Sequence, residues 1–140
     1  MIILDTNVIS EFMKKAPDPR VVAWARRQRA KELAVSAISV AEIGRGIARL
    51  PEGKRRTGLA ERFEGFMAAA FEGRALPFDT AAARVYGDLA SAREKTGHHA
   101  DAVDLVIASI ARAHKGAIAT RNTGDFTGCG LALIDPWSDG

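Results

Sequence analysis

Residues 1–7 read Met-Ile-Ile-Leu-Asp-Thr-Asn. Consecutive apolar residues bounded by polar ones are typical of a short strand buried on both faces, as in a parallel sheet. Asp5, Thr6 and Asn7 end the strand, and Thr6 or Asn7 can cap a helix, so the same stretch predicts that a helix begins near Val8. A buried strand that passes directly into a helix indicates an α/β fold.

The same alternation of short apolar strands and amphipathic helices continues along the chain. Further strands are predicted at residues 33–36, 75–78, 117–120 and 131–134. The strand at residues 75–78 is predicted at an edge of the sheet, because Pro77 has no N–H to donate to a neighbouring strand. Helices are predicted where apolar residues recur every three or four positions: near residues 8–16, 20–29, 39–50 and 79–96, in a segment ending near Gly73, and from about Ala102. We therefore predict a parallel sheet covered on both faces, within a single domain of residues 1–140.

The composition excludes several classes of protein. Of the 140 residues, 47% are hydrophobic and 26% are charged, which is typical of a globular chain and not of a disordered one. No apolar run approaches the roughly 18 residues that span a bilayer, and the N-terminus lacks the basic flank of a signal peptide. The single cysteine, Cys129, excludes an intrachain disulfide and a cysteine-based zinc site. We expect a cytoplasmic protein that does not associate with membranes.

The charge is weakly positive and unevenly distributed. The formal net charge is +3, and 14 of the 20 cationic side chains are arginines, which form forked contacts with phosphate. Cations cluster at residues 26–31 and 54–56. Such clusters are compatible with a polyanionic partner and equally with solvated helix surface.

Four acidic residues fall near the predicted ends of strands or starts of helices. Asp5 directly follows the first strand, and Glu42 lies early in the helix after the second. Asp104 lies in the first turn of the most apolar helix, and Asp125 comes shortly after the strand that ends at residue 120. Because ligands bind at the carboxyl ends of parallel strands, these segments can bring all four acids to one edge of the sheet.

Each acid also has a purely structural interpretation. Residues 39–42 have the spacing of a capping box, with Glu42 at its acidic position. Asp101 and Asp104 are placed to cap a helix and to interact with its dipole, and Asp125 can occupy an ordinary turn. Asp5 can cap the first helix, although a carboxylate directly after a buried strand is harder to explain in this way.

Converging carboxylates would require cations. Two carboxylates about 4 Å apart repel by roughly 4 kcal/mol at an effective dielectric constant near 20, so several together must protonate or bind cations. Oxygen ligands favour Mg²⁺ or Mn²⁺ over zinc, and His98, His99 and His114 lack the spacing of a zinc site. A carboxylate-held Mg²⁺ can activate water and stabilise charge at phosphorus. Together with the basic surface, this chemistry predicts phosphodiester hydrolysis.

Five stretches carry a resemblance to a known family. They read MIILDTNVISEF, SAISVAEIGRGIARLPEGKRR, DAVDLVIASIARAH, IATRNTGDF and LALIDPW. Their content and order over nearly the whole chain resemble PIN-domain ribonucleases, in particular the VapC/FitB-like toxins of prokaryotic toxin–antitoxin pairs. The resemblance implies a three-layer α/β/α fold around a central, mainly parallel sheet, with an acidic pocket for Mg²⁺ or Mn²⁺ at its edge.

The resemblance also implies which residues act. Asp5, Glu42 and Asp104 match the family's first three acids, which are catalytic and hold the metal. We assign Asp125 as the fourth. Some relatives carry an acid directly after the threonine-arginine pair, where this chain has Asn122, so Asn122 stays open as a neutral ligand or supporting residue.

Other positions have supporting interpretations. Thr6 resembles the hydroxyl residue that supports the first acid, and Arg121 is a candidate contact for phosphate. Asp101 is interpreted as a helix cap, and Trp24 and Trp137 as packing or interface residues.

The resemblance further implies partners. It implies a homodimer, or a larger complex, with a cognate VapB-like antitoxin that wraps an apolar groove and inserts an arginine or similar side chain into the acidic pocket. We expect the helices that carry Phe12, Met13 and Trp24 to form this groove. The implied substrate is RNA, cut where its bases and backbone are accessible.

Our leading hypothesis is therefore a metal-dependent endoribonuclease toxin of a VapBC-type system. The alternative is an RNA- or partner-binding module that keeps the fold but has little catalytic activity, which the neutral Asn122 leaves open. A phosphatase that forms an aspartyl-phosphate is disfavoured, because residues 5–7 supply only one acid after the first strand.

Overall fold

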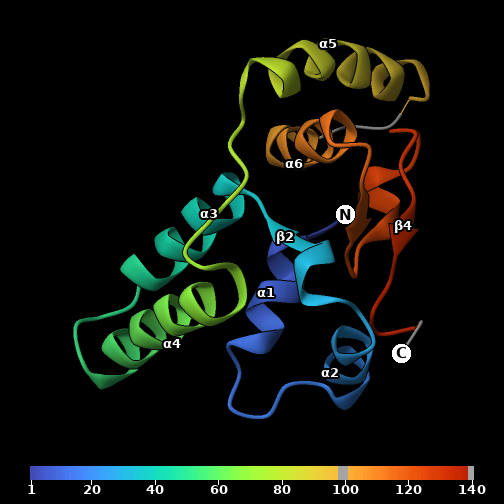
Figure 1. Ribbon diagram of the computed structural model, residues 1–140. Coiled ribbons are helices and arrows are strands. Elements are labelled where there is room, and N and C mark those ends of the chain that lie inside the picture. Colours follow the sequence, from blue (N-terminus) through green and yellow to red (C-terminus); the bar gives the residue numbers. More distant parts are fainter. Residues whose placement is uncertain (98–100, 139–140) are drawn as a thin grey trace.

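The computed structural model describes residues 1–97 and 101–138. Its centre is a four-stranded sheet in the order β2-β1-β3-β4, and every pairing is parallel (Figure 1). The strands are short: β1 (Ile2–Leu4), β2 (Leu33–Val35), β3 (Ala117–Ala119) and β4 (Leu133–Ile134). The predicted parallel sheet is therefore present, with the N-terminal strand between two neighbours.

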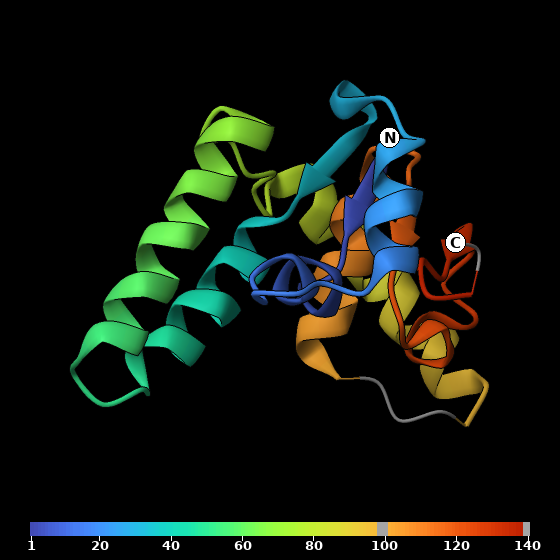
Figure 2. The same cartoon turned by 90° about the horizontal axis from the view of Figure 1, so that it is seen from below.

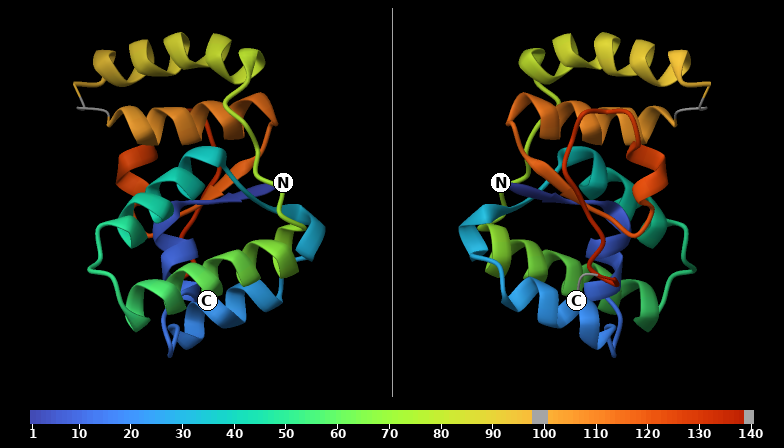
Figure 3. Two further views of the ribbon diagram at one scale, coloured as in Figure 1. Left: turned by 90° about the vertical axis from the view of Figure 1, so that its left-hand side faces the viewer. Right: turned by 90° about the vertical axis from the view of Figure 1, so that its right-hand side faces the viewer.

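Helices cover both faces of this sheet. They are α1 (Thr6–Phe12), α2 (Pro19–Arg26), α3 (Ala37–Ala48), α4 (Lys54–Phe71), α5 (Thr80–Lys95) and α6 (Ala102–Ala113), with two short 3₁₀ helices, η1 (Ala30–Glu32) and η2 (Thr123–Phe126). Figure 3 shows α5 and α6 over one face of the sheet and α1, α2 and α4 over the other. Helix α3 lies beside α4, and Figure 2 shows this pair projecting from one side of the molecule. The predicted three-layer α/β/α architecture is confirmed.

Alternation along the strands divides the core into two halves. Leu4 packs with the buried side chains of α1, α2, α3 and α4, whereas its neighbour Ile3 packs with those of α5, α6 and η2. Successive side chains of a strand point to opposite faces, so each short strand supplies both halves. Both predicted packing tryptophans, Trp24 and Trp137, lie in the half that contains Leu4.

One predicted strand is wrong. Residues 75–78 form no strand and contribute a single isolated parallel bridge between Leu76 and Ser36. Leu76 donates to Val35 O and accepts from Ala37 N, both at 2.8 Å. Past this bridge the partner segment turns into α3 at Ala37, so the pairing does not continue.

The predicted start of α3 is also wrong. The helix is capped by Ser36, whose hydroxyl accepts a hydrogen bond from Ser39 N, and so it begins at Ala37. Ser39 therefore stands inside the first turn, and Glu42 lies a further turn along the helix, too far to complete a capping box. The capping prediction for Asp101 is confirmed, because its carboxylate accepts from Val103 N.

Two further sequence expectations concern the histidines and membranes. His98 and His99 lie outside the described residues, and His114 stands at the C-terminal end of α6. Within residues 1–97 and 101–138, none of the helices has the length and apolar character needed to cross a bilayer.

We expect truncation of Ile118 to destabilise the protein in proportion to the volume removed. Ile118 is fully buried on β3, which lies between β1 and β4 in the sheet. Ile118→Val should lower the free energy of unfolding by about 0.5–1.5 kcal/mol and Ile118→Ala by about 2–5 kcal/mol. Urea unfolding with an unchanged m-value would measure both. A smaller loss for alanine than for valine would contradict this packing.

Candidate active site

A polar residue follows each of the four strands at the same edge of the sheet. These residues are Asp5 after β1, Ser36 after β2, Thr120 after β3 and Asp135 after β4. Asp5, Ser36 and Thr120 are buried. The carboxyl ends of parallel strands are where α/β folds bind ligands, so a site is expected at this edge.

Asp5 is held by hydrogen bonds from three side-chain and backbone donors. Its Oδ1 accepts from Thr6 N at 2.8 Å, which makes it the N-cap of α1. Its Oδ2 accepts from Thr120 Oγ1 at 2.8 Å and from Asn7 Nδ2 at 3.3 Å. Burial nevertheless raises the pKa of Asp5, against the lowering effect of these hydrogen bonds, and the charges of Glu42 and Asp125 add to the rise. The capping role of Asp5 is therefore confirmed, and its role in a site stays a prediction.

A hydroxyl pair connects α1 to α3 and fixes Glu42. Thr6 Oγ1 donates to Glu42 Oε1 at 2.5 Å and is hydrogen-bonded to Ser39 Oγ at 2.9 Å. Ser39 is fully buried and lies 3.3 Å from the Ser36 hydroxyl. Because α3 begins at Ala37 and not at Ser39, Glu42 faces this hydroxyl and not its own helix terminus.

The pKa of Asp104 shows the effect of the other acids at this edge of the sheet. Its pKa is raised to about 7, first by partial burial and then by the charges of Asp5, Asp125, Asp101 and Glu42. A carboxyl group near several others resists ionisation because like charges repel. Asp104 is thus close enough to the other acids for their charges to act on it.

All seven residues predicted for the site line one cleft of about 450 Å³. They are the four acids Asp5, Glu42, Asp104 and Asp125 together with Thr6, Arg121 and Asn122. The acids come from four segments that are far apart in the sequence. The sequence analysis missed five other residues of the cleft: Asn7, Ser10, Glu11, Lys14 and Trp137.

Glu11 is the most unexpected of these. It is 5% exposed, and its carboxylate accepts from Lys14 Nζ and from Asp18 N, both at 2.9 Å. Burial alone would raise the pKa of Glu11, but these two hydrogen bonds and the charge of Lys14 lower it overall. Its place among the apolar residues of a short helix gave no signal in the sequence.

The donor set of the cleft suits a hard divalent cation. Carboxylate oxygens of the four acids dominate it, and burial and mutual repulsion raise the pKa of Asp5 and Asp104. A bound Mg²⁺ or Mn²⁺ would relieve this repulsion. Among the described residues, however, no three histidine, cysteine, aspartate or glutamate groups are gathered closely enough to form a ready metal cluster. The residues fit the ion chemically, and their side chains would have to move together to hold it.

Comparison with known proteins identifies the family. The chain matches the PIN domain over residues 2–127. The chain belongs to the PIN-domain family. It is 47% identical over 137 residues to the VapC ribonuclease Y4jK of Sinorhizobium fredii, a match that covers 98% of each chain. It is 42% identical over 139 residues to the toxin FitB of Neisseria gonorrhoeae, covering 99% of this chain and 100% of FitB.

A solved structure agrees with these sequence matches. The crystal structure of FitAcB from Neisseria gonorrhoeae has a TM-score of 0.89 to this chain at 42% identity, covering 98% of this chain and 99% of the other. Within the PIN-domain family, this chain therefore belongs with the VapC and FitB proteins. The resemblance noted in the sequence is confirmed.

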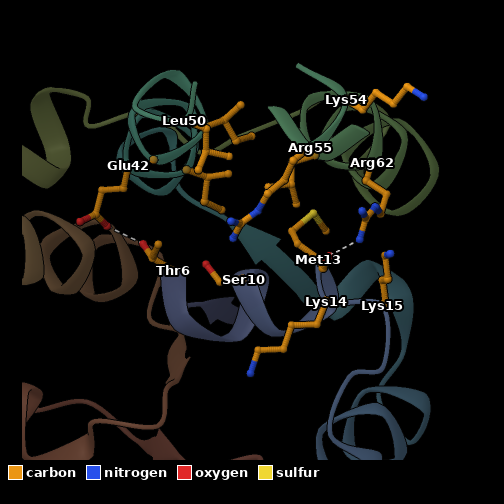
Figure 4. A pocket seen from close by; sticks show the side chains of 14 residues that line it. Thr6, Ser10, Met13, Lys14, Lys15, Glu42, Leu50, Lys54, Arg55 and Arg62 are labelled. Atoms are coloured by element: carbon orange, nitrogen blue, oxygen red, sulfur yellow. Dashed lines mark hydrogen bonds between the residues drawn. The ribbon is translucent and has the colours of Figure 1, made fainter. Parts of the chain in front are cut away.

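A second hollow of this PIN domain adjoins the acidic cleft. It is a groove of about 910 Å³ between α1, α3 and α4, and it shares Thr6, Ser10, Lys14 and Glu42 with the cleft (Figure 4). Its apolar residues are Met13, Ile43, Ile47, Leu50 and Leu59, and its cationic residues are Lys14, Lys15, Lys54, Arg55 and Arg62. We call this hollow the α1–α3–α4 groove.

The α1–α3–α4 groove only partly matches the apolar groove expected from the sequence. Of the three side chains predicted to form it, Met13 lines this groove. Trp24 is buried in the core, and Phe12 stacks on Phe66 with ring centroids 5.8 Å apart. Figure 4 shows the Arg55 side chain reaching into the groove and Lys54 pointing away from it.

Two residues are placed at the fourth position of the acidic site. Asn122 and Asp125 both line the cleft. Asn122 N donates to Thr120 Oγ1 at 3.0 Å, and Asp125 N donates to Asn122 O at 3.0 Å. The 3₁₀ helix η2 thus turns Asp125 back toward the strand end, so both residues reach the same edge.

The raised pKa of Asp104 predicts a pH dependence of stability in the metal-free protein. The folded-state pKa of about 7 exceeds the unfolded value of 3.8, so the folded state binds more protons between these values. The stabilisation of the protonated form is therefore fully present below about pH 4 and is lost as the pH rises through 7. Asp104→Asn removes this contribution, so wild type should gain in melting temperature relative to the variant as the pH falls from 8 to 5. Thermal unfolding in chelator measures the difference. A difference that is constant across this range would contradict the raised pKa.

Proposed function

We propose that this PIN-domain protein is a metal-dependent endoribonuclease that acts as the toxin of a VapBC-type toxin–antitoxin pair. The observation that carries the proposal is the gathering of Asp5, Glu42, Asp104 and Asp125 from four distant segments around one cleft. The raised pKa of Asp104 supports it, because an isolated helix-capping role gives no reason for a carboxyl group to be surrounded by other acids. The name of the relative Y4jK, a VapC ribonuclease, agrees with this activity.

In the proposed reaction the metal and the residues around it have different roles. Asp5, Glu42, Asp104 and Asp125 would hold Mg²⁺ or Mn²⁺, which when bound lowers the pKa of water and neutralises charge developing at phosphorus. Thr120 and Asn7 hold the Asp5 carboxylate in place from β3 and α1. Thr6 does the same for Glu42. Holding two of the four carboxylates reduces the conformational freedom that is lost when the side chains gather round the ion.

The substrate proposed is an RNA strand whose phosphates lie along the cleft. Arg121 lines the cleft together with the acids and supplies a guanidinium for a substrate phosphate. Asp104 must be ionised to serve as a metal ligand, and with a pKa of about 7 it ionises near neutral pH even before the ion binds. A bound cation would lower this pKa further.

The proposed partner is a cognate VapB-like antitoxin, within a complex that contains a homodimer of this chain. The relative FitB has been solved within FitAcB. The α1–α3–α4 groove offers apolar side chains for such a partner and opens directly onto Glu42 and Thr6 of the acidic cleft. A side chain reaching from the groove would meet the carboxylates. The cytoplasmic location expected from the sequence stays a prediction.

Removing one acid should abolish RNA cleavage without unfolding the protein. We expect Asp104→Asn and Asp5→Asn to lower kcat/KM for RNA at least about 100-fold in Mg²⁺ or Mn²⁺, because each removes a metal ligand. A chelator should abolish the wild-type activity. Glu64→Gln, on the exposed face of α4, is the matched control and should leave cleavage unchanged. Activity that survives both substitutions would reject the mechanism.

Metal titration distinguishes this nuclease from a binding module with the same fold. Calorimetry with Mg²⁺ or Mn²⁺ should show binding to the wild type and weaker binding to Asp125→Asn. Asn122→Ala should bind the ion nearly as well as wild type, because a neutral amide contributes less to a cation than a carboxylate does. Weakening by Asn122→Ala alone would assign the fourth ligand to Asn122, and no binding to wild type would favour the binding module.

A further inference from the structure

One cation beside the acidic cleft is held by an aromatic ring. Arg121 stands two residues after the end of β3, and Trp137 stands three residues after the end of β4. The guanidinium carbon of Arg121 lies over the Trp137 ring, 5.0 Å from its centroid. Both residues line the cleft that contains the four acids.

The ring itself is fixed by the protein core. Trp137 is 6% exposed and packs with the buried side chains of α1, α2, α3 and α4. Its backbone N–H donates to Asp135 Oδ1 at 2.9 Å, in the turn that follows β4. The backbone of Arg121 is also held by a hydrogen bond, which its N–H donates to Asn7 Oδ1 at 3.2 Å. Trp137 is therefore anchored to the turn after β4, and Arg121 to the first turn of α1.

The kind of contact matters for what Arg121 can still bind. A guanidinium that stacks on an aromatic ring does so with its face, whereas a carboxylate or phosphate binds the N–H groups along its edge. Within the described residues no acid lies within ion-pair distance of Arg121, although its charge helps to lower the pKa of Asp18, whereas Lys14 is paired with Glu11 at 2.9 Å. The contact with the Trp137 ring therefore places the Arg121 guanidinium at the cleft while its charge is not neutralised by a close ion pair.

A polyanion that binds at this cleft requires a cationic group beside the carboxylates. The four carboxylates repel phosphate, and an arginine with free edge donors offers forked hydrogen bonds to phosphate oxygens. An arginine on a flexible stem would lose side-chain entropy of up to about 2 kcal/mol on binding. The Trp137 ring restricts the side chain beforehand, so less of this cost remains when phosphate binds.

We propose that Trp137 is a positioning residue, which holds the Arg121 guanidinium at the acidic cleft with its N–H edge directed to a phosphate of the RNA strand. The inference rests on the proposed function for the nature of the ligand and adds to it the residue that places the phosphate contact. Arg121 touches the substrate, and Trp137 acts through Arg121.

The test measures RNA binding apart from cleavage. The protein carries Asp104→Asn so that RNA stays intact, and the probe is a fluorescein-labelled, unstructured oligoribonucleotide followed by anisotropy in Mg²⁺. Into this background we introduce Arg121→Ala, Trp137→Leu, Trp137→Phe and the double variant Arg121→Ala/Trp137→Leu. Trp24→Leu is the matched control, because Trp24 is buried in the same half of the core, on α2, but does not line the cleft.

Arg121→Ala should weaken RNA binding about tenfold, which corresponds to about 1.4 kcal/mol. It should also reduce the slope of log K against log salt by about 0.7, the change expected for one lost phosphate contact on a single strand. Trp137→Leu should weaken binding about three- to fivefold, and Trp137→Phe, which keeps an aromatic face, should weaken it less. The double variant should bind no more weakly than Arg121→Ala alone.

The control separates positioning from stability. Trp24→Leu and Trp137→Leu should both lower the melting temperature, but only Trp137→Leu should change the affinity for RNA. If Trp137→Leu unfolds, Trp137→Phe tests the inference instead. Trp137→Phe should lower the affinity for RNA when Arg121 is present and should have no effect when it is combined with Arg121→Ala. Fully additive losses, or unchanged affinity in both Trp137 variants, would overturn the inference.

The outcomes also separate this inference from the proposed function. If wild-type protein cleaves RNA but Arg121→Ala binds RNA as tightly as its parent, the positioning inference fails and the nuclease stands. If wild-type protein does not cleave RNA in any divalent metal but the Arg121 and Trp137 variants show the coupled loss of affinity, the nuclease fails and the RNA contact stands.

Discussion

The hydrogen bond between the carboxylate of Asp5 and the hydroxyl of Thr120 is the contact on which the site depends. It joins the ends of the two central strands, β1 and β3, just beyond the backbone bond from Asp5 N to Ala119 O. The same carboxylate caps α1, so one buried group fixes the sheet edge and the helix that leaves it. A buried carboxylate must be hydrogen-bonded to remain charged, and the strand ends supply the donors. The fold and the acidic cleft are therefore two consequences of one arrangement.

Much of this arrangement could be predicted from the sequence, because it follows from local patterns. Apolar runs marked four of the five predicted strands correctly, and the acids near their ends marked the edge where the cleft lies. What failed depended on partners distant in the chain. Residues 75–78 have a strand-like composition, but how far they pair is decided by the neighbouring segment, which turns into α3 directly after Ser36. Ser36 and Ser39 have equal capping chemistry, and only the register of β2 decides between them.

Two of the five cleft residues that the sequence did not reveal share one property. Glu11 and Trp137 each belong to a class that normally has another role, a surface acid on a helix and an aromatic residue in the core. Glu11 is buried because the turn after α1 supplies donors to its carboxylate, and Trp137 reaches the cleft because β4 ends beside β3. Neither fact is visible in the spacing of residue types. Such positions are found from tertiary contacts, whereas the acids were found from their distance to strand ends.

The charge distribution of the cleft sets what can occupy it. A chain with a net charge of +3 gathers four carboxylates at one edge while Arg121, Lys14 and the cations of the α1–α3–α4 groove surround them. Phosphate is attracted to the surrounding cations but repelled by the centre, unless a divalent ion neutralises it. The groove and the cleft share Thr6 and Glu42, whose hydrogen bond forms part of both walls. A partner seated in the groove and reaching those residues would compete with metal and RNA for the same carboxylate. Such a partner would then inhibit by competing with metal and RNA for the carboxylate of Glu42, in proportion to its concentration and affinity. No second conformation of the fold would be needed.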